Sequence, residues 1–184
     1  SMATGLDEIS CTALATDSYG DSDTESVSIF VDETTPEFVT VASISPSTDI
    51  TTSSGLSCTA VATDPDGTSV SYSYEWKNGS STLGSNQSIS LTPSIVQPTD
   101  VVECIVTATD GAGEQETSTA SIMVGNTAPT LNSIAITPNS GIDTSSTLAC
   151  AVNVVDADLE TLTPTFAWYN GSTLLGSGSS FTLT

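Results

Sequence analysis

The sequence contains no histidine, and lysine and arginine together contribute a single residue against 22 acidic ones. The formal net charge of −21 excludes nucleic acids and anionic lipid surfaces as partners, because both would be repelled. The absence of histidine removes the side chain that most often acts as a general base, and the pairs of acidic residues fall in predicted loops rather than in a hydrophobic cleft. We therefore expect that the protein is not an enzyme and does not bind nucleic acid.

Long apolar runs and helix-forming segments are also scarce. No run of about 18 apolar residues occurs, so we expect no membrane insertion within this segment. Serine and threonine are abundant instead, and short runs alternate apolar with polar residues, as in LSCTAVAT at 56–63 and VVECIVTAT at 101–109. Turn signals such as Asp-Pro-Asp-Gly at 64–67 separate these runs. The pattern is typical of antiparallel sheets and predicts an all-β protein.

One pattern of about 92 residues occurs twice along the chain, in a shifted frame. The recurring residues lie 92 or 93 positions apart and include Cys58 with Cys150, Trp76 with Trp168, Cys11 with Cys104, and Pro36 with Pro129. On this alignment residues 36–128 form a complete unit, residues 129–184 are the first part of a unit, and residues 1–35 are the last part of one. The sequence thus predicts one complete unit and two complementary partial units.

Three runs of the complete unit have period-two apolar patterns, which predict strands with one buried face. The residues expected to face inward are Leu56, Cys58, Ala60 and Ala62; Tyr72, Tyr74 and Trp76; and Val102, Cys104, Val106 and Ala108. Cys58 precedes Trp76 by 18 positions and Cys104 follows it by 28. With this spacing the two cysteines can face each other across two sheets, with the indole packed against them.

These residues give the chain a resemblance to the immunoglobulin-like fold. More narrowly, it resembles the tandem Ig-like, cadherin-like or PKD-like repeats of secreted and cell-surface proteins of bacteria and archaea. The residues that carry the resemblance are Cys58, Trp76, Asn78-Gly79, Cys104, Ala-Thr-Asp-Gly at 108–111 and Asn-Thr-Ala-Pro at 126–129. The resemblance implies Ig-like antiparallel β-sandwich repeats and an extracellular or cell-surface location. It departs from the common pattern at Val102 and Ile9, where a tyrosine often stands.

Four cysteines without histidine, tens of residues apart, favour disulfides in an oxidising compartment over a zinc site. We expect a Cys58–Cys104 disulfide, the alternative being two buried free thiols. Cys11 and Cys150 hold the corresponding positions of one unit, but they lie on opposite sides of the complete unit and are not expected to meet within one chain. Either the C-terminal part of one chain is completed by the N-terminal part of the next, with a Cys150–Cys11 bridge and a filament as the result, or the segment belongs to a longer array of covalently linked repeats. A third alternative is frayed or domain-swapped ends.

Acidic residues gather in loops that, in Ig-like units, lie at the junction with the preceding unit. The first junction would bring together Asp32, Glu33, Asp64, Asp66, Asp110 and Glu114. The second would combine Asn126, Asp156, Asp158 and Glu160 with Asp17, Asp21 and Asp23 from the last part of another unit. Oxygen ligands from several loops suit Ca²⁺, and the resemblance to cadherin-like repeats implies that bound ions stiffen such junctions. The alternative is ordinary turn chemistry on an acidic, well solvated surface.

Three Asn-X-Ser sequons are candidate glycosylation sites, namely Asn78, Asn86 and Asn170. Two of them are followed by glycine and are expected in a two-residue hairpin turn of type I′, which explains Asn78 and Asn170 without a glycan. Exposed hairpin turns on an extracellular protein are nevertheless accessible acceptors, so glycans are possible partners.

Taken together, these features predict a non-enzymatic extracellular structural repeat that forms a filament or surface stalk. The alternative is an adhesion or carbohydrate-binding module of a secreted or cell-surface protein. Sugar-binding sandwiches present planar aromatic side chains on an exposed face. Here the aromatic residues expected outside the core are Tyr19 and Tyr169, and two isolated tyrosines make a poor platform.

Overall fold

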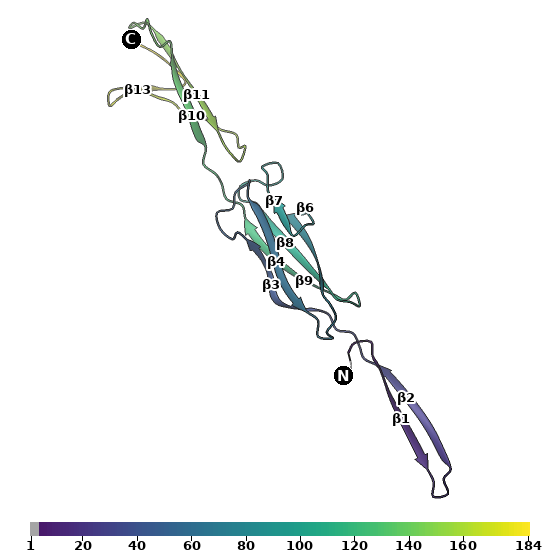
Figure 1. Cartoon of the computed structure of the whole chain (residues 1–184). Helices are drawn as coiled ribbons and strands as arrows, with labels where there is room; N and C mark the ends of the chain where they lie inside the picture. Colours follow the sequence, from purple (N-terminus) through teal and green to yellow (C-terminus); the bar gives the residue numbers. More distant parts are fainter. Residues whose placement is uncertain (1–3) are drawn as a thin grey trace. The chain divides into compact units, whose positions relative to one another are not determined.

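The computed structural model describes residues 4–184, which form strands joined by turns and loops, with no helix among them (Figure 1). Every strand pair is antiparallel, which confirms the all-β prediction. Consequently no helix in this part of the chain is long and apolar enough to cross a membrane. The chain divides into two compact units, which are described in turn. The first consists of Ser1–Thr48, Gly55–Ser90 and Val101–Met123, and the second of Asp49–Ser54, Leu91–Asp100 and Val124–Thr184.

The first unit begins with a two-stranded hairpin, which we name the N-terminal hairpin. Strands β1 (Glu8–Thr16) and β2 (Ser22–Phe30) pair along their full length in nine consecutive pairs, without a bulge. Every residue of both strands is exposed. An isolated two-stranded hairpin is at best marginally stable in water, so this ribbon lacks the packed face that sheets normally need.

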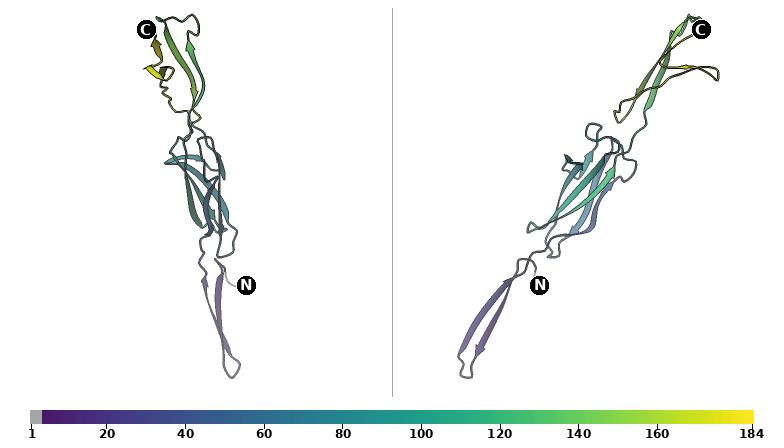
Figure 2. Two further views of the ribbon diagram at one scale, coloured as in Figure 1. Left: turned by 90° about the vertical axis from the view of Figure 1, so that its left-hand side faces the viewer. Right: turned by 180° about the vertical axis from the view of Figure 1, so that it is seen from behind.

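The rest of the first unit contains two sheets (Figure 2). The three-stranded sheet has the order β3-β4-β7, with β3 (Glu37–Ser45), β4 (Gly55–Thr63) and β7 (Ser88–Ser90). The four-stranded sheet has the order β6-β5-β8-β9, with β5 (Ser71–Asn78), β6 (Ser81–Gly84), β8 (Val101–Thr109) and β9 (Gln115–Met123). From Val102 to Thr109 the residues of β8 alternate between buried and half-buried, as the period-two pattern predicts.

A disulfide between Cys58 of β4 and Cys104 of β8 joins the two sheets. Both cysteines and Trp76 are 0% exposed. The indole Nε1 donates a hydrogen bond to the backbone oxygen of Asn86 at 2.8 Å, so the one polar atom of the ring is satisfied inside the core. The disulfide indicates that the protein matures in an oxidising compartment.

Two details differ from the sequence expectations. Tyr72 shares the parity of Trp76, but it is 36% exposed, and its hydroxyl accepts from the Ala62 N–H at 2.7 Å and donates to the Ala62 oxygen at 3.2 Å. These two hydrogen bonds tie the exposed Tyr72 ring to the backbone of β4.

The hairpin turn after β5 is also not type I′, because Asn78 pairs with Ser81 as the last residue of the strand and does not have a positive φ. Gly79, with φ 57°, comes first in the turn, where type II′ requires glycine.

The second unit contains two small sheets. Strands β10 (Thr130–Thr137), β11 (Thr147–Val155) and β14 (Ser180–Thr182) form one, and β12 (Ala167–Asn170) and β13 (Thr173–Ser177) form the other. The indole of Trp168 stacks on Phe181, with ring centroids 5.8 Å apart, and donates to the Gly178 oxygen at 2.9 Å. This hydrogen bond is the counterpart, 92 positions on, of the one from Trp76 to Asn86.

The strand pairings repeat with the same offsets as the sequence. The β11–β14 pairs match the β4–β7 pairs 92 positions earlier, and the irregularity between Trp168 and Tyr169 repeats the one between Trp76 and Lys77. The nine β1–β2 pairs match the nine β8–β9 pairs 93 positions later. Residues 124–184 thus contain counterparts of β3 to β7 and none of β8 and β9, whereas the N-terminal hairpin is the counterpart of those two strands.

Candidate functional site

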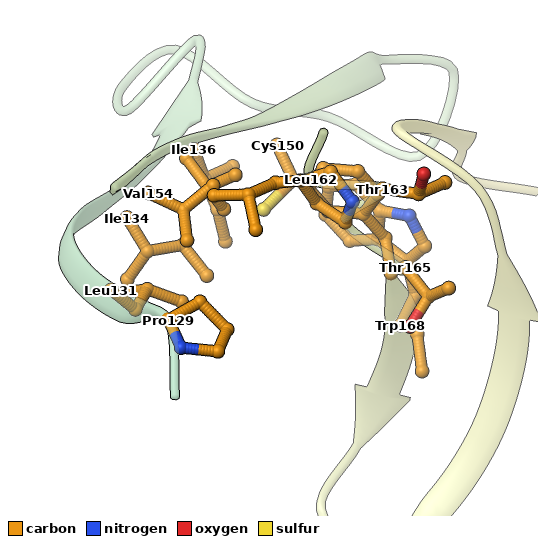
Figure 3. A pocket seen from close by; sticks show the side chains of 14 residues that line it. Pro129, Leu131, Ile134, Ile136, Cys150, Val154, Leu162, Thr163, Thr165 and Trp168 are labelled. Atoms are coloured by element: carbon orange, nitrogen blue, oxygen red, sulfur yellow. The ribbon is translucent and has the colours of Figure 1, made fainter. Parts of the chain in front are cut away.

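The second unit has a largely apolar groove with a volume of about 480 Å³ (Figure 3). One wall comes from β10 and β11 and includes Ile134 and Val154, and the other includes Trp168 and the segment before β12. The sulfur of Cys150 lies between the two walls. The groove is lined by Pro129, Leu131, Ile134, Ile136, Cys150, Val152, Val154, Leu162, Thr163, Pro164, Thr165, Phe166, Ala167 and Trp168.

The groove is open because the residues that line it are core residues without a cover. Ile134 of β10 is 63% exposed, whereas its counterpart Ala42 of β3 is 8% exposed. In the first unit this space is closed by β8, whose Val102 and Val106 are 0% exposed. Apolar side chains left in water forgo about 25 cal/mol for each Å² that could be buried, so this surface favours a partner that covers it.

The N-terminal hairpin presents the complementary face. The counterparts of the four inward residues of β8 are Ile9, Cys11, Ala13 and Ala15, all on one side of β1. All four are exposed, and Ile9 is 45% exposed where its counterpart Val102 is 0%. Within the described chain neither Cys11 nor Cys150 forms a disulfide, although their counterparts are bonded to each other.

An acidic cluster in the first unit can hold a metal ion. Glu33 precedes β3, Asp64 follows β4 and Asp110 follows β8, and one carboxylate oxygen of each lies within 4.8 Å of the others. Asp110 is 6% exposed, and its Oδ1 accepts the backbone N–H groups of the turn before β9 at 2.7 to 2.9 Å. The other oxygen, Oδ2, is buried and has no hydrogen-bond partner in residues 4–184, and the same holds for Oε1 of Glu33. Carboxylate oxygens are the ligands that a hard cation such as Ca²⁺ takes, and the two unpaired oxygens make this cluster a candidate cation site.

The charges of this cluster oppose one another. Burial raises the pKa of Glu33 above its usual value, and the negative charges of Asp66, Asp110, Asp64 and Glu114 raise it further. Ionised Glu33 therefore costs folding free energy, and that part of the stability is lost as the pH rises through the interval between the usual pKa and the raised one. A bound divalent cation would remove this repulsion.

A second acidic cluster lies in the second unit. One carboxylate oxygen each of Asp156, Asp158 and Glu160 lies within 4.8 Å of the others, and the two aspartates are 9% and 0% exposed. Oδ1 of Asp156 accepts the Asp158 N–H at 2.7 Å, while Oδ2 is buried without a partner among the described residues. Asp158 accepts from the Thr52 hydroxyl at 2.5 Å and from the Thr127 N–H at 2.6 Å. These bonds, the Thr52 bond first, lower the pKa of Asp158.

The remaining residues predicted as metal ligands lie outside these two clusters. Asp32 is exposed, and Asp17 lies in the turn of the N-terminal hairpin. Asp66 is occupied as a hydrogen-bond acceptor: its Oδ1 accepts the Gly5 N–H at 3.1 Å, and its Oδ2 accepts from the backbone and hydroxyl of Thr34. The Thr34 hydroxyl is the largest cause of the lowered pKa of Asp66. Among the predicted glycosylation sites, Asn86 and Asn170 are exposed and Asn78 is half-buried.

The sequence analysis missed the threonines that hold these carboxylates. Thr34 and Thr127 occupy the same position of the two linkers, 93 residues apart. The Thr34 N–H donates to Asp66, and the Thr127 N–H donates to Asp158, which is the counterpart of Asp66. The signal that could have found them is the repeat of Thr at this linker position. It also missed Gly5, where an added Cβ would lie 2.3 Å from Oε2 of Glu33, so that a larger residue there would displace the Glu33 carboxylate.

Comparison with known proteins finds no matching family model and no matching curated sequence. A proposal for the function therefore rests on the groove, the hairpin and the acidic clusters.

Proposed function

We propose that the protein is a non-enzymatic extracellular structural repeat whose Ig-like units assemble head to tail into a filament or surface stalk. The observation that carries this proposal is the match between the groove and the N-terminal hairpin. Residues 129–184 have the pairings of β3 to β7 of the complete repeat at residues 36–128, which we call the central unit, and the N-terminal hairpin has the pairings of β8 and β9. Residues 36–128 then form the one complete β-sandwich.

In this arrangement the hairpin of one copy enters the groove of the next. Strand β1 would pair with β12 as β8 pairs with β5, which places Cys11 opposite Trp168 as Cys104 lies opposite Trp76. Strand β12 has four residues and β5 has eight, so we expect residues 163–166 to extend the strand once β1 provides its hydrogen bonds. The contact joins two different surfaces of identical chains, and such a contact generates an open filament unless its rotation closes a ring.

A disulfide between Cys150 of one copy and Cys11 of the next would lock the contact. It would correspond to the Cys58–Cys104 bond, which joins β4 and β8, the counterparts of β11 and β1. On denaturing gels without reductant we expect a ladder with steps of about 18.7 kDa, because each joined chain adds one mass unit. Reductant should collapse the ladder to one band. A far larger species that survives reduction would instead mean one continuous polypeptide, and a single 18.7 kDa band under both conditions would contradict the assembly.

We further propose that Ca²⁺ binds the cluster of Glu33, Asp64 and Asp110. The support is the pair of buried, unpaired oxygens on Glu33 and Asp110, together with the raised pKa of Glu33. Calcium accepts six to eight oxygen ligands at about 2.3 to 2.6 Å, so carboxylates gathered from three loops suit it, with water completing the shell.

Replacing Glu33 by glutamine is expected to make the cation-free protein more stable at neutral pH. The amide carries no charge, so the stability that wild type loses as the pH rises through the raised Glu33 pKa is not lost in Glu33→Gln. The gap in melting temperature between the two should be absent well below the usual glutamate pKa and open above it. In calcium the wild type should have the higher melting temperature, because the ion binds its folded state and stabilises it, whereas Glu33→Gln has lost a ligand.

Thermal unfolding by circular dichroism, in chelator and in millimolar calcium across a pH series, measures these effects. Glu37→Gln is the matched control. Glu37 is exposed at the start of β3, and its substitution removes the same charge. Equal responses of the two variants to calcium would remove Glu33 from the site.

The alternative function, adhesion or carbohydrate binding, has less support. Tyr19 and Tyr169 are 93% and 61% exposed, and each stands in a separate unit. Two isolated tyrosines make a poor platform for stacking on a sugar.

A further inference from the structure

The second acidic cluster differs from the first at one instructive position. In the first unit Thr68 donates its N–H and its hydroxyl to Oδ2 of Asp64, at 2.8 and 2.5 Å. The counterparts 92 positions on are Glu160 and Asp156. Glu160 replaces a donor by a carboxylate, and Oδ2 of Asp156 accordingly has no hydrogen-bond partner in the described part of the chain.

This arrangement points to a cation. Asp156 is 9% exposed, and a buried charged oxygen without a donor or counter-ion is costly. Its carboxylate faces those of Asp158 and Glu160, with one oxygen of each within 4.8 Å of the others. Oxygens bound to one calcium ion at about 2.3 to 2.6 Å lie at most about 5 Å apart, so the three can share one ion.

The second cluster has no carboxylate of its own at the place that Asp110 takes in the first cluster. In the first unit the third carboxylate comes from Asp110, in the turn between β8 and β9. Its counterpart is Asp17, in the turn of the N-terminal hairpin, and the two turns have the same geometry. The Asp17 N–H donates to the Asp21 oxygen at 2.9 Å, as the Asp110 N–H does to the Glu114 oxygen at 3.1 Å.

The orientation of the Asp17 carboxylate is also fixed by its turn. Oδ1 accepts the N–H groups of Tyr19 and Asp21 at 2.9 and 3.0 Å, just as Oδ1 of Asp110 accepts those of its own turn. The hairpin therefore carries a carboxylate in the position and orientation that Asp110 has in the first cluster.

We infer that a divalent cation binds between Asp156 and Glu160 of one chain and Asp17 of the next, so that the ion completes its ligand shell only when the hairpin has entered the groove. The inference rests on the proposed head-to-tail assembly and adds a regulator to it. Without the ion, the incoming carboxylate meets a cluster of the same charge, which opposes docking. With the ion, the carboxylates of Asp156, Glu160 and the incoming Asp17 hold the two chains together. Divalent cations therefore strengthen assembly.

The test measures the strength of the contact at equilibrium. The full chain carries Cys11→Ser, which prevents a disulfide from trapping the contact, and sedimentation velocity gives the weight-average mass over a concentration series. Buffers contain chelator, calcium chloride, magnesium chloride, or sodium chloride at matched ionic strength. Asp17→Asn and Glu160→Gln are measured in the same background. Glu8→Gln is the matched control, because Glu8 is exposed at the opposite end of β1 and loses the same charge.

We expect calcium to strengthen association about tenfold or more, a typical coupling between two binding events, in the background chain and in Glu8→Gln. In Asp17→Asn and Glu160→Gln this gain should be lost. Sodium chloride that strengthens association as much as calcium would reduce the effect to screening and overturn the inference. Equal association in calcium and chelator would overturn it too, while leaving head-to-tail assembly in place. No association under any condition would overturn both.

Glu160→Thr provides a second variant with an opposite expectation. It restores the residue that stands at position 68 of the first unit, where the threonine donates to Oδ2 of Asp64. The variant should associate in chelator more strongly than the background chain and gain less from calcium. If it instead keeps the full response to calcium, Glu160 is not a ligand and the inference fails.

Discussion

A chain with Cys58→Ala and Cys104→Ala is expected to unfold about 15 to 30 °C below wild type. The disulfide spans a sequence separation of 46, and the chain-entropy model gives about 4 kcal/mol for a loop of this length. In a domain of about 90 residues, each kcal/mol changes the melting temperature by about 4 to 8 °C. The bond also joins the two sheets at their fully buried centre, so its loss affects the packing of both. Thermal unfolding followed by circular dichroism measures the shift.

The control for this prediction is Cys11→Ala, measured at a concentration too low for assembly. Cys11 is exposed in the chain and forms no disulfide there, and exposed substitutions usually change stability by less than about 0.5 kcal/mol. A similar loss in both variants would mean that the Cys58–Cys104 bond does not dominate the stability of the central unit.

Replacing Ile9 by glutamate is expected to abolish head-to-tail association. In the proposed contact Ile9 takes the position of Val102, which is 0% exposed. The change forgoes about 1.5 to 3 kcal/mol of apolar burial. It also places an unpaired charge in the core, at a cost of several kcal/mol. Because each 1.4 kcal/mol is tenfold, the association constant should fall by at least about 1,000-fold.

Ser10→Glu is the matched control, since it introduces the same residue one position further on. Adjacent strand residues point to opposite faces, and the counterpart of Ser10 is Glu103, which is half-buried and already a glutamate. In sedimentation velocity with reductant, Ile9→Glu should remain at the mass of one chain while Ser10→Glu assembles like wild type. Equal assembly of both variants would show that this face of β1 does not enter the groove.

Much of the strand arrangement could be predicted from the sequence because burial fixes it. A slip of one residue would move Val102, Cys104 and Val106 from the buried face to the exposed one, so their period-two spacing determines which face is buried. The recurrence of cysteine and tryptophan at one interval also predicts two partial units. The resemblance to Ig-like units placed six acidic residues at one junction, and three of them, Glu33, Asp64 and Asp110, form a cluster.

The roles of individual carboxylates could not be predicted in the same way. Asp64 and Asp66 look equivalent in the sequence, and each accepts three hydrogen bonds, Asp64 from Asp66 and Thr68 and Asp66 from Gly5 and Thr34, yet only Asp64 belongs to the acidic cluster. Thr52 is a clearer case: its hydroxyl reaches Asp158 across 106 positions, and no local pattern marks it.

The turn after β5 shows the same limit at the level of backbone geometry. An Asn-Gly pair favours a type I′ turn when both residues occupy the central positions. Here the strand continues through Asn78, so the glycine moves to the first central position and the turn changes type. The extent of pairing with β8, which the dipeptide alone does not encode, decides the outcome.

The central claim is that the N-terminal hairpin of one chain completes the C-terminal part of another, and disulfide mapping between isotopically distinct chains tests it most directly. Unlabelled and ¹⁵N-labelled chains are mixed in reductant, oxidised slowly and digested, and cysteine-linked peptides are identified by mass spectrometry. We predict Cys11–Cys150 peptides, about half of them with one light and one heavy partner, alongside Cys58–Cys104 peptides that are never mixed. Cys11–Cys150 peptides that are never mixed, or Cys11 linked only to Cys11, would contradict the account.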